Sequence, residues 1–391
     1  MVRKNIALWT LYDFANSIVI VVFFLYFSQW LVIEKGFSDF GYNMIFMIGS
    51  VLLLLTAPIL GGMADKNHGH QTYLNRLTLL TFLFFLLTSL VALFFSRHIY
   101  MAALFFLLAN YFYQFSFVFY NSLLHFIANP KQEGRISGVG QAGNWLGQLF
   151  GLLITLPLAS GAVYLFGEAG RAQTFLPATI LFLILGLPML LFFKLEKKES
   201  TYKSPGLRVL YRSQWREFKE LIQSPGMGLF LLSYFFFNDA IITASNNFPI
   251  YLQNVFSFTD KAKSFLLGGI LLTSSIGALC SGWLADRIGL KKTLLLVLGS
   301  WIIVLPLLAI TYDVKLFIII SISMGFLFGA VWTVTRAVML MLCPKDKLNF
   351  GFSFYTLAER VSTLVGPLVW GIITYTLRDK GPIRYRIAAA S

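Results

Sequence analysis

Eleven long apolar runs dominate the sequence, and each is about as long as a helix that crosses a lipid bilayer. A hydrocarbon core of ~30 Å requires roughly 20 apolar residues in a helix, and a helix satisfies every backbone polar group inside the lipid. The runs are continuous rather than alternating, which argues against membrane-spanning strands. They lie near residues 6–34, 42–64, 75–95, 99–128, 135–158, 173–194, 226–256, 264–285, 292–311, 315–342 and 349–377.

The composition fits a chain that is immersed in lipid. Hydrophobic residues make up 57% of the chain and charged residues only 12%, whereas about a quarter of a soluble domain is charged. So few charged side chains cannot cover a surface that faces water. We therefore predict an all-α polytopic membrane protein.

The distribution of positive charge predicts the orientation of the chain. The net charge of +14 is compatible with nucleic-acid binding, but the positions of the charges argue otherwise. If the amino terminus is cytoplasmic and the loops alternate, the inner segments hold nineteen Lys and Arg residues and the outer loops before residue 378 hold six. This asymmetry follows the positive-inside rule. It predicts a cytoplasmic amino terminus, membrane lipid as a partner and no nucleic acid.

The chain divides into two halves around its only long polar loop. Six runs precede residue 195 and five follow residue 225. We predict an amino-terminal bundle over 1–194, a cytoplasmic linker over 195–225 and a carboxy-terminal bundle over 226–391. Within the linker, "LRVLYRSQWREFKELIQ" has apolar residues at helical spacing, which predicts an amphipathic helix at the inner membrane face.

The two halves repeat each other. The pattern Gly-x-x-Ala-Asp-Lys/Arg follows the second run as "GGMADK" and the eighth as "GWLADR". The first run of each half also contains an acid, Asp13 in "LYDFANS" and Asp239 in "FFFNDA". Parallel repeats of this kind are typical of one superfamily of transporters. The repeated loops supply the candidate conformational residues Gly61, Asp65, Gly282, Asp286 and Arg287.

With these loops, the chain resembles the major facilitator superfamily. Within it, the chain resembles the autophagy-related vacuolar effluxer family and its bacterial relatives. The resemblance implies two six-helix bundles that rock about a central site, with helices 1, 4, 7 and 10 around the cavity. It further implies export of small, amino-acid-like solutes, and a bacterial cytoplasmic membrane. The blocks that carry it are "WTLYDFANS", "FYNSLL", "GRISGVGQAGNWLG", "YFFFNDA" and "GFSFYTLAERVSTLVGPLVWG".

Polar side chains on the cavity helices form the candidate translocation site. An ionisable group at the bilayer centre costs about 2.5–3.5 kcal/mol on insertion scales, so it normally faces water or a partner. Two alternatives remain open: Asp13 braces a neighbouring helix, and Arg336 and Glu359 form a static ion pair. The candidate residues are Asp13, Asn16, Tyr113, Gln114, Asn121, Asp239, Thr243, Asn246, Arg336 and Glu359.

Two packing expectations follow from small and acidic residues. Gly143, Gly147 and Gly151 form a face of small residues that allows close helix approach in lipid. We expect this face to lie against the eighth run, which contains Gly268, Gly269 and Gly277. We expect Asp65 and Asp286 to accept hydrogen bonds from helix ends and basic side chains.

Rival functions lack support in the sequence. A receptor or scaffold, or a membrane-embedded enzyme, is the alternative to a monomeric transporter of small solutes. No nucleophile motif or phosphate-binding loop is visible, and we predict no enzyme, cofactor or metal. His68 and His70 fall in a polar loop and are expected to be solvated. Buried carboxylates are compatible with proton coupling and equally with facilitated diffusion.

The last residues predict a further helix. After the eleventh run comes "RDKGPIRYRIAAAS", which is basic and then turns apolar. We expect it to be a connection followed by the first turn of a twelfth helix, so that the carboxy-terminal bundle has five helices and a truncated sixth.

Overall fold

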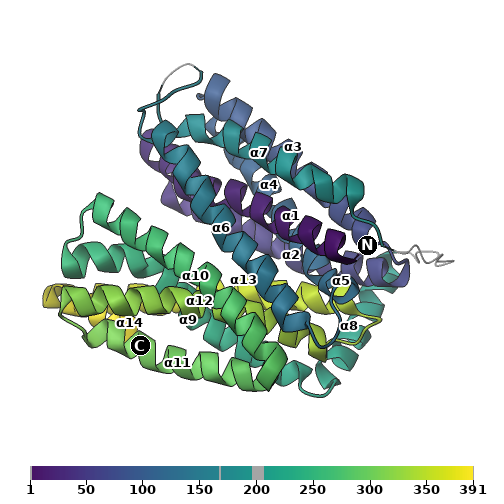
Figure 1. Cartoon of the computed structure of the whole chain (residues 1–391). Helices are drawn as coiled ribbons and strands as arrows, with labels where there is room; N and C mark the ends of the chain where they lie inside the picture. Colours follow the sequence, from purple (N-terminus) through teal and green to yellow (C-terminus); the bar gives the residue numbers. More distant parts are fainter. Residues whose placement is uncertain (1, 167–168, 196–206, 391) are drawn as a thin grey trace. The chain divides into compact units, whose positions relative to one another are not determined.

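The computed structural model describes residues 2–166, 169–195 and 207–390, and these form helices joined by turns without any strand. Within the described residues, ten helical segments are long and apolar enough to cross a membrane. The eleventh run forms the 29-residue helix α13 (Leu348–Thr376). The prediction that all eleven runs are helices is therefore confirmed (Figure 1).

The helices follow the predicted order along the chain. The first half consists of α1 (Val2–Val22), extended by the π-helical segments η1 (Phe23–Phe27) and η2 (Gln29–Glu34), and of α2 (Asp39–Lys66), α3 (His70–Phe94), α4 (Ile99–Ser122), α5 (Leu124–Ile127), α6 (Glu133–Ala159), η3 (Arg171–Thr174) and α7 (Phe175–Phe192). The linker contains α8 (Leu207–Gln223). The second half consists of α9 (Met227–Phe256), α10 (Asp260–Ile288), α11 (Leu290–Ile310), α12 (Val314–Leu342), α13, η4 (Arg378–Lys380) and α14 (Ile383–Ala390).

These helices form two compact units. Unit 1 comprises residues 1–129, 143–221 and 343–356, and unit 2 comprises residues 130–142, 222–342 and 357–391. Each unit therefore includes the beginning of one long helix that comes from the other half of the sequence. Unit 1 takes the start of α13, and unit 2 takes the start of α6.

Unit 1 has a core rich in aromatic side chains. α1 packs against α7, and α4 packs against α2 and α3. At the centre lie Phe23 and Phe27 of η1, Phe106 of α4 and Phe175 of α7, all almost fully buried. The Phe27 and Phe106 ring centroids are 4.3 Å apart, and those of Phe23 and Phe175 are 5.0 Å apart. These large rings fill the space between the three helices.

Unit 2 is held by a close crossing of α10 and α12. Small residues allow the backbones to approach each other: a methyl group on Gly277 would lie 2.9 Å from the Phe326 Cα, and one on Gly325 would lie 2.9 Å from the Ile270 Cα. α11 packs on α12, and the short helix α14 packs on α9 and α11. Arg386 of α14 donates hydrogen bonds to two carbonyls at the end of α11.

The small-residue face of α6 packs against α1 rather than against α10. Methyl groups on Gly143 and Gly151 would lie 2.9 Å from the Thr10 side chain and 3.1 Å from the Ile18 Cα. The expectation that this face meets the eighth run is therefore wrong. The glycines that approach α10 come earlier in α6, where Gly134 and Gly138 lie against Gly282 and Ala278. A small-residue pattern predicts close approach but does not name the partner.

Substitution of Gly147 should destabilise unit 1. A methyl group there would lie 3.0 Å from the Phe14 Cα, so α1 and α6 would have to separate. We expect Gly147→Ala to lower the free energy of unfolding by about 1–3 kcal/mol, as overpacking does in protein cores. The control is Gly299→Ala in α11, where no atom lies within 4 Å of an added methyl group. Thermal unfolding in detergent measures both. Equal stability of the two variants would contradict the packing account.

Candidate functional site

Asp13 lies at a junction of three helices in unit 1. It is only 1% exposed. Its carboxylate accepts a hydrogen bond from the Tyr120 hydroxyl of α4 at 2.9 Å and another from the Asn144 amide of α6 at 2.9 Å. Three of the sequence blocks singled out above therefore meet at one carboxylate.

Aromatic stacking supports the same junction. The rings of Trp9 and Tyr120 are stacked with centroids 4.7 Å apart. The Trp9 indole donates to the Tyr120 carbonyl at 3.1 Å, and the Tyr120 hydroxyl also lies 3.2 Å from the Trp9 carbonyl. The Tyr12 ring also stacks on Tyr120, and the Tyr12 hydroxyl lies 2.6 Å from the Thr78 hydroxyl of α3. Asp13 thus belongs to a polar network that joins α1, α4 and α6.

The other predicted residues of α1 and α4 are buried in unit 1. Asn16 donates to the Tyr12 carbonyl at 2.9 Å, and its Oδ1 has no hydrogen-bond partner among the described residues. Gln114 lies 3.4 Å from Asn110. Tyr113 packs its ring 5.0 Å from Phe117, and Asn121 is also buried.

Asp239 occupies the corresponding position in unit 2 but is less enclosed. It is half-buried, and its carboxylate accepts a hydrogen bond from the Gly366 backbone N–H of α13 at 2.8 Å. One turn along α9, the Thr243 hydroxyl is buried and has no hydrogen-bond partner among the described residues. A carboxylate and an uncommitted hydroxyl therefore lie together between α9 and α13, and Asn246 is exposed on the same helix.

Neighbouring contacts fix α9 against α12 and α13. The Asn238 amide donates to the Ser362 hydroxyl at 2.7 Å, and the Trp332 indole donates to the Asn238 carbonyl oxygen at 3.3 Å. These two contacts satisfy Asn238, which is 1% exposed, and they position the adjacent Asp239.

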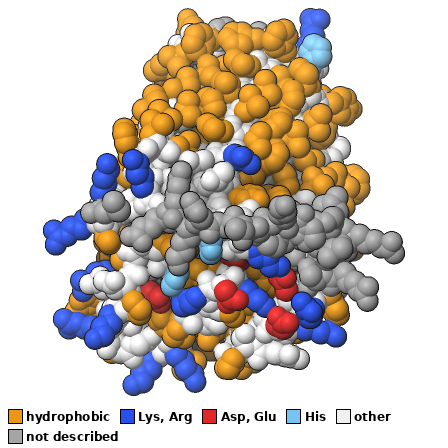
Figure 2. All heavy atoms as spheres, turned by 90° about the vertical axis from the view of Figure 1, so that its right-hand side faces the viewer, with side chains coloured by type: hydrophobic (Ala, Val, Ile, Leu, Met, Phe, Trp, Pro, Cys, Tyr) orange, Lys and Arg blue, Asp and Glu red, His pale blue; other side chains and the backbone are white. Residues whose placement is uncertain are grey.

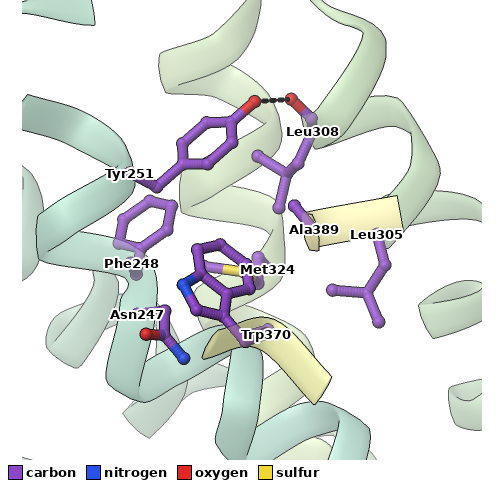
Figure 3. A pocket seen from close by; sticks show the side chains of 9 residues that line it. Asn247, Phe248, Tyr251, Leu305, Leu308, Met324, Trp370 and Ala389 are labelled. Carbon is purple, nitrogen blue, oxygen red and sulfur yellow. Dashed lines mark hydrogen bonds between the residues drawn. The ribbon is translucent and has the colours of Figure 1, made fainter. Parts of the chain in front are cut away.

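A small pocket lies two turns beyond Asp239 in unit 2 (Figure 3). Its volume is about 30 Å³, enough for a water molecule or two. Most of its lining side chains are apolar, and the Tyr251 hydroxyl points away to the Leu308 carbonyl at 3.0 Å. The pocket is too small for an organic solute. It is lined by Ala244, Asn247, Phe248, Tyr251, Leu305, Leu308, Met324, Trp370 and Ala389.

The predicted Arg336–Glu359 pair is wrong. Arg336 is buried in α12 and donates to the hydroxyl and the carbonyl of Ser137 in α6, at 3.0 and 2.6 Å. Glu359 pairs instead with Arg360 at 2.9 Å. Glu359 and Arg360 are adjacent in α13, so their Cα atoms lie ~100° apart around the helix axis. Both side chains are nevertheless long enough to meet at the surface of that helix.

Asp65 caps the beginning of α13 within unit 1. Its carboxylate accepts hydrogen bonds from the backbone N–H groups of Asn349 and Phe350 and from the Asn349 amide, all at 2.9 Å. The first N–H groups of a helix have no partner inside the helix and attract negative charge. Gly61 permits the approach, because a methyl group there would lie 2.8 Å from the Asn349 carbonyl oxygen. We refer to these contacts as the α13 cap.

Asp286 makes the equivalent α6 cap within unit 2. It accepts hydrogen bonds from the backbone N–H groups of Gly134 and Arg135 at 2.9 and 3.1 Å. Gly282 again permits the approach, because an added methyl group would lie 3.1 Å from the Gly134 carbonyl carbon. Arg287 stacks 3.8 Å above the Trp283 ring. In each repeat, therefore, an acid of one sequence half holds a helix start that belongs to the other half.

The linker helix α8 is attached to the same end of unit 1 as the α13 cap. Glu217 is buried and pairs with Lys66 at 2.6 Å, and Glu220 pairs with Lys347 at 2.6 Å. The Lys347 hydrogen bond and charge lower the pKa of Glu220, which keeps that carboxyl ionised at neutral pH. Phe218 packs its ring 4.7 Å from Phe354. The predicted α8 helix exists, although the side chains of residues 207–213 lie outside the described set.

A polar cavity of about 920 Å³ lies beside the α13 cap in unit 1. Figure 2 shows the face at the end of the helices where the cap lies, and charged and histidine side chains gather on this face. The expectation that His70 is solvated is wrong: α3 begins at His70, and this residue is only 6% exposed. The cavity lining includes Asp65, Lys66, His68, His70, His125, Arg216, Glu217, Lys345, Asp346 and Lys347. Among the described residues, no group of three potential ligands could hold a metal ion.

Sequence reasoning missed several partners of the predicted residues. Asn144 and Ser137 lie within the glycine-rich block that follows "FYNSLL", and Gly366 lies within the last block. Their presence in those blocks was the only available signal. Nothing in the sequence indicated which acid or base each one contacts.

The arrangement defines the class of protein. A multi-pass chain in which intramembrane carboxylates, close glycine crossings and capped helix starts recur in both halves is built as a membrane transporter. The model of the Major Facilitator Superfamily matches residues 14–273 and 236–378. The chain belongs to this superfamily of transporters, and it is a multi-pass integral membrane protein rather than an enzyme.

Curated relatives agree with this assignment. An uncharacterized protein of Aquifex aeolicus is 26% identical over 380 residues, which cover 96% of this chain and 90% of that protein. The uncharacterized MFS-type transporter YxiO of Bacillus subtilis is 24% identical, with coverage of 92% and 86%. Autophagy-related protein 22 of Yarrowia lipolytica is 26% identical over 289 residues, covering 63% of this chain and 47% of that protein.

A solved structure shows the same fold. The human organic anion transporter MFSD10 aligns with a TM-score of 0.74, covering 99% of this chain and 97% of that chain at 13% identity. The major facilitator fold is thus shared, and the resemblance to the autophagy-related family and its bacterial relatives is confirmed.

Proposed function

We propose that this transporter moves a small polar solute with a cationic group, such as an amino-acid-like amine, by alternating access. The observation that carries the proposal is the Asp239 carboxylate, which is half-buried in α9 and, among the described residues, accepts one hydrogen bond, from the Gly366 backbone N–H. The uncommitted Thr243 hydroxyl lies one turn away. An ammonium group needs a carboxylate and further acceptors in place of its water shell, and this pair supplies both.

The structure supports a different role for Asp13. Its carboxylate is enclosed and already accepts hydrogen bonds from two other helices. We propose that Asp13 positions α1, α4 and α6, and that Asp239 contacts the solute. The contribution of Asn16, Tyr113, Gln114, Asn121, Asn246, Arg336 and Glu359 to translocation stays a prediction.

The two caps supply contacts that alternating access has to break and remake. The α13 cap and the α6 cap each join a helix of residues 1–194 to a helix of residues 226–391. Motion of one predicted bundle against the other therefore requires these hydrogen bonds to be released. We propose that Gly61, Asp65, Gly282 and Asp286 act in this step on the cytoplasmic side of the membrane. The bacterial relatives support a bacterial cytoplasmic membrane as the location.

Ligand-dependent thermal stability of the purified protein tests the solute class. A ligand that binds only the folded state stabilises it by RT ln(1 + c/Kd) at ligand concentration c, so the unfolding temperature rises as the ligand concentration exceeds Kd. We expect amines and amino acids to raise it, and equally sized solutes without a cationic group to leave it unchanged. Stabilisation by the neutral or anionic members of the panel alone would overturn the proposal.

A further inference from the structure

His70 is inserted into the α13 cap. Its Nδ1 lies 2.6 Å from the Asn349 amide nitrogen and 4.0 Å from the Asp65 carboxylate. The Asn349 amide group also accepts a hydrogen bond from the Ser122 hydroxyl at 2.5 Å. Because the Asn349 nitrogen is a donor, Nδ1 of His70 must be an unprotonated acceptor in this arrangement.

Protonation of Nδ1 is incompatible with this hydrogen bond. An imidazolium would present a second donor to the Asn349 amide at 2.6 Å, and two donors repel each other. The Asp65 carboxylate, 4.0 Å from Nδ1, is a group that could accept a hydrogen bond from the new N–H. That carboxylate holds the first N–H groups of α13. An Asp65–imidazolium pair would therefore compete with the α13 cap for the same oxygen atoms.

The cavity beside the cap gives water and protons access to this histidine, because His70 itself contributes to its lining. The charged and titratable groups around it come from six other segments. They are Asp65 and Lys66 of α2, His68 of the following turn, His125 of α5, Lys194 after α7, Arg216, Glu217 and Glu220 of α8, and Lys345, Asp346 and Lys347 before α13. Lys66 is already paired with Glu217, so Asp65 is the acceptor that a charged His70 would reach first.

We propose that His70 is a proton site that controls the α13 cap: the neutral imidazole holds the cap closed, and protonation releases the start of α13. This inference concerns the regulation of the cap and rests on the proposed role of that cap in transport. It would give the transporter a response to acidification on the side where α2 ends.

Cys343 is a native reporter for the release. It begins the segment between α12 and α13, is only 3% exposed, and its Sγ lies 3.4 Å from the Lys347 carbonyl oxygen. Burial raises the pKa of its thiol to about 12, so it should react slowly while the cap is closed. Cys280 is exposed in unit 2 and serves as an internal reference. The measured quantity is the ratio of Cys343 to Cys280 modification by a dithiodipyridine between pH 8 and pH 4, in the purified protein without solute.

In the wild-type chain we expect this ratio to rise roughly tenfold as the pH falls, which corresponds to one pKa unit of coupling. His70→Asn keeps an acceptor near the position of Nδ1 but cannot take up a proton, so its ratio should stay low at every pH. His68→Gln and His125→Gln are the matched controls from the same cavity, and both should behave like the wild type. A wild-type ratio that does not change with pH, or a His70→Asn ratio that still rises, would overturn the proposal.

A second variant covers the case in which His70→Asn does not fold. Asp65→Asn removes the carboxylate for which the imidazolium competes, so the ratio should be high and independent of pH. A folded Asp65→Asn protein whose ratio still depends on pH would overturn the proposal. Because the assay uses no solute and no transport, its failure can be told apart from failure of the proposed solute site.

Discussion

Asp239→Asn should reduce transport of an amine-bearing solute by about 10–100-fold while leaving the protein folded. The change keeps the size of the side chain and an oxygen that can accept the Gly366 hydrogen bond. It removes the charge. A hydrogen bond to a charged group contributes about 1.5–3 kcal/mol, and every 1.4 kcal/mol is a tenfold change in affinity. The loss should appear mainly as a higher KM for uptake.

The matched control for this variant is Asp379→Asn. Its carboxyl lies in η4 of the same unit and is 92% exposed, so its neutralisation should leave uptake unchanged. Gel filtration and thermal unfolding establish that both proteins are folded. Wild-type uptake by Asp239→Asn would remove this carboxylate from the solute site.

Asp13→Leu should instead lower the free energy of unfolding of unit 1 by about 2–4 kcal/mol. The substitution leaves the Asn144 amide without its acceptor and removes one of the two acceptors of the Tyr120 hydroxyl. A buried donor without a partner costs about 1–3 kcal/mol. Tyr120 retains the Trp9 carbonyl at 3.2 Å, which limits the loss. Thermal unfolding in detergent gives the measurement.

A double variant tests whether the loss of stability comes from the broken hydrogen bonds or from any substitution at this position. Adding Asn144→Leu to Asp13→Leu removes the orphaned donor and should recover a clear part of the lost stability. Asp13→Asn retains one acceptor oxygen and should be less damaging than Asp13→Leu. If Asp13→Leu is as stable as the wild type, the carboxylate does not hold the three helices together.

The sequence predicted the helices well because the length of an apolar run is a direct consequence of bilayer thickness. It also identified Asp65 and Asp286, since an acid repeated at the end of two equivalent helices indicates a repeated contact. The partners of these acids are helix starts more than 150 residues away along the chain: 152 residues for the Asp286–Gly134 contact and 284 for the Asp65–Asn349 contact. Only the folded arrangement shows them.

Rotation about the helix axis explains the failed predictions. Arg336 and Glu359 were paired because they lie at similar depth, but depth does not specify which way a side chain points. Arg336 points toward Ser137 of α6. Likewise, the glycine face of α6 required a close neighbour, and α1 rather than α10 provides it. His70 was misplaced because α3 starts earlier than the apolar run does.

Counterflow in proteoliposomes tests the central claim most directly. Vesicles that contain the purified chain are loaded with one unlabelled amine-bearing solute and diluted into a trace of the same labelled solute. We expect transient accumulation of label with the wild-type chain and with Asp379→Asn, and a loss of about 10–100-fold with Asp239→Asn, as argued from the charged hydrogen bond. Equal accumulation of label by Asp239→Asn would contradict the account. So would accumulation that is seen only when the experiment is repeated with a solute that lacks a cationic group.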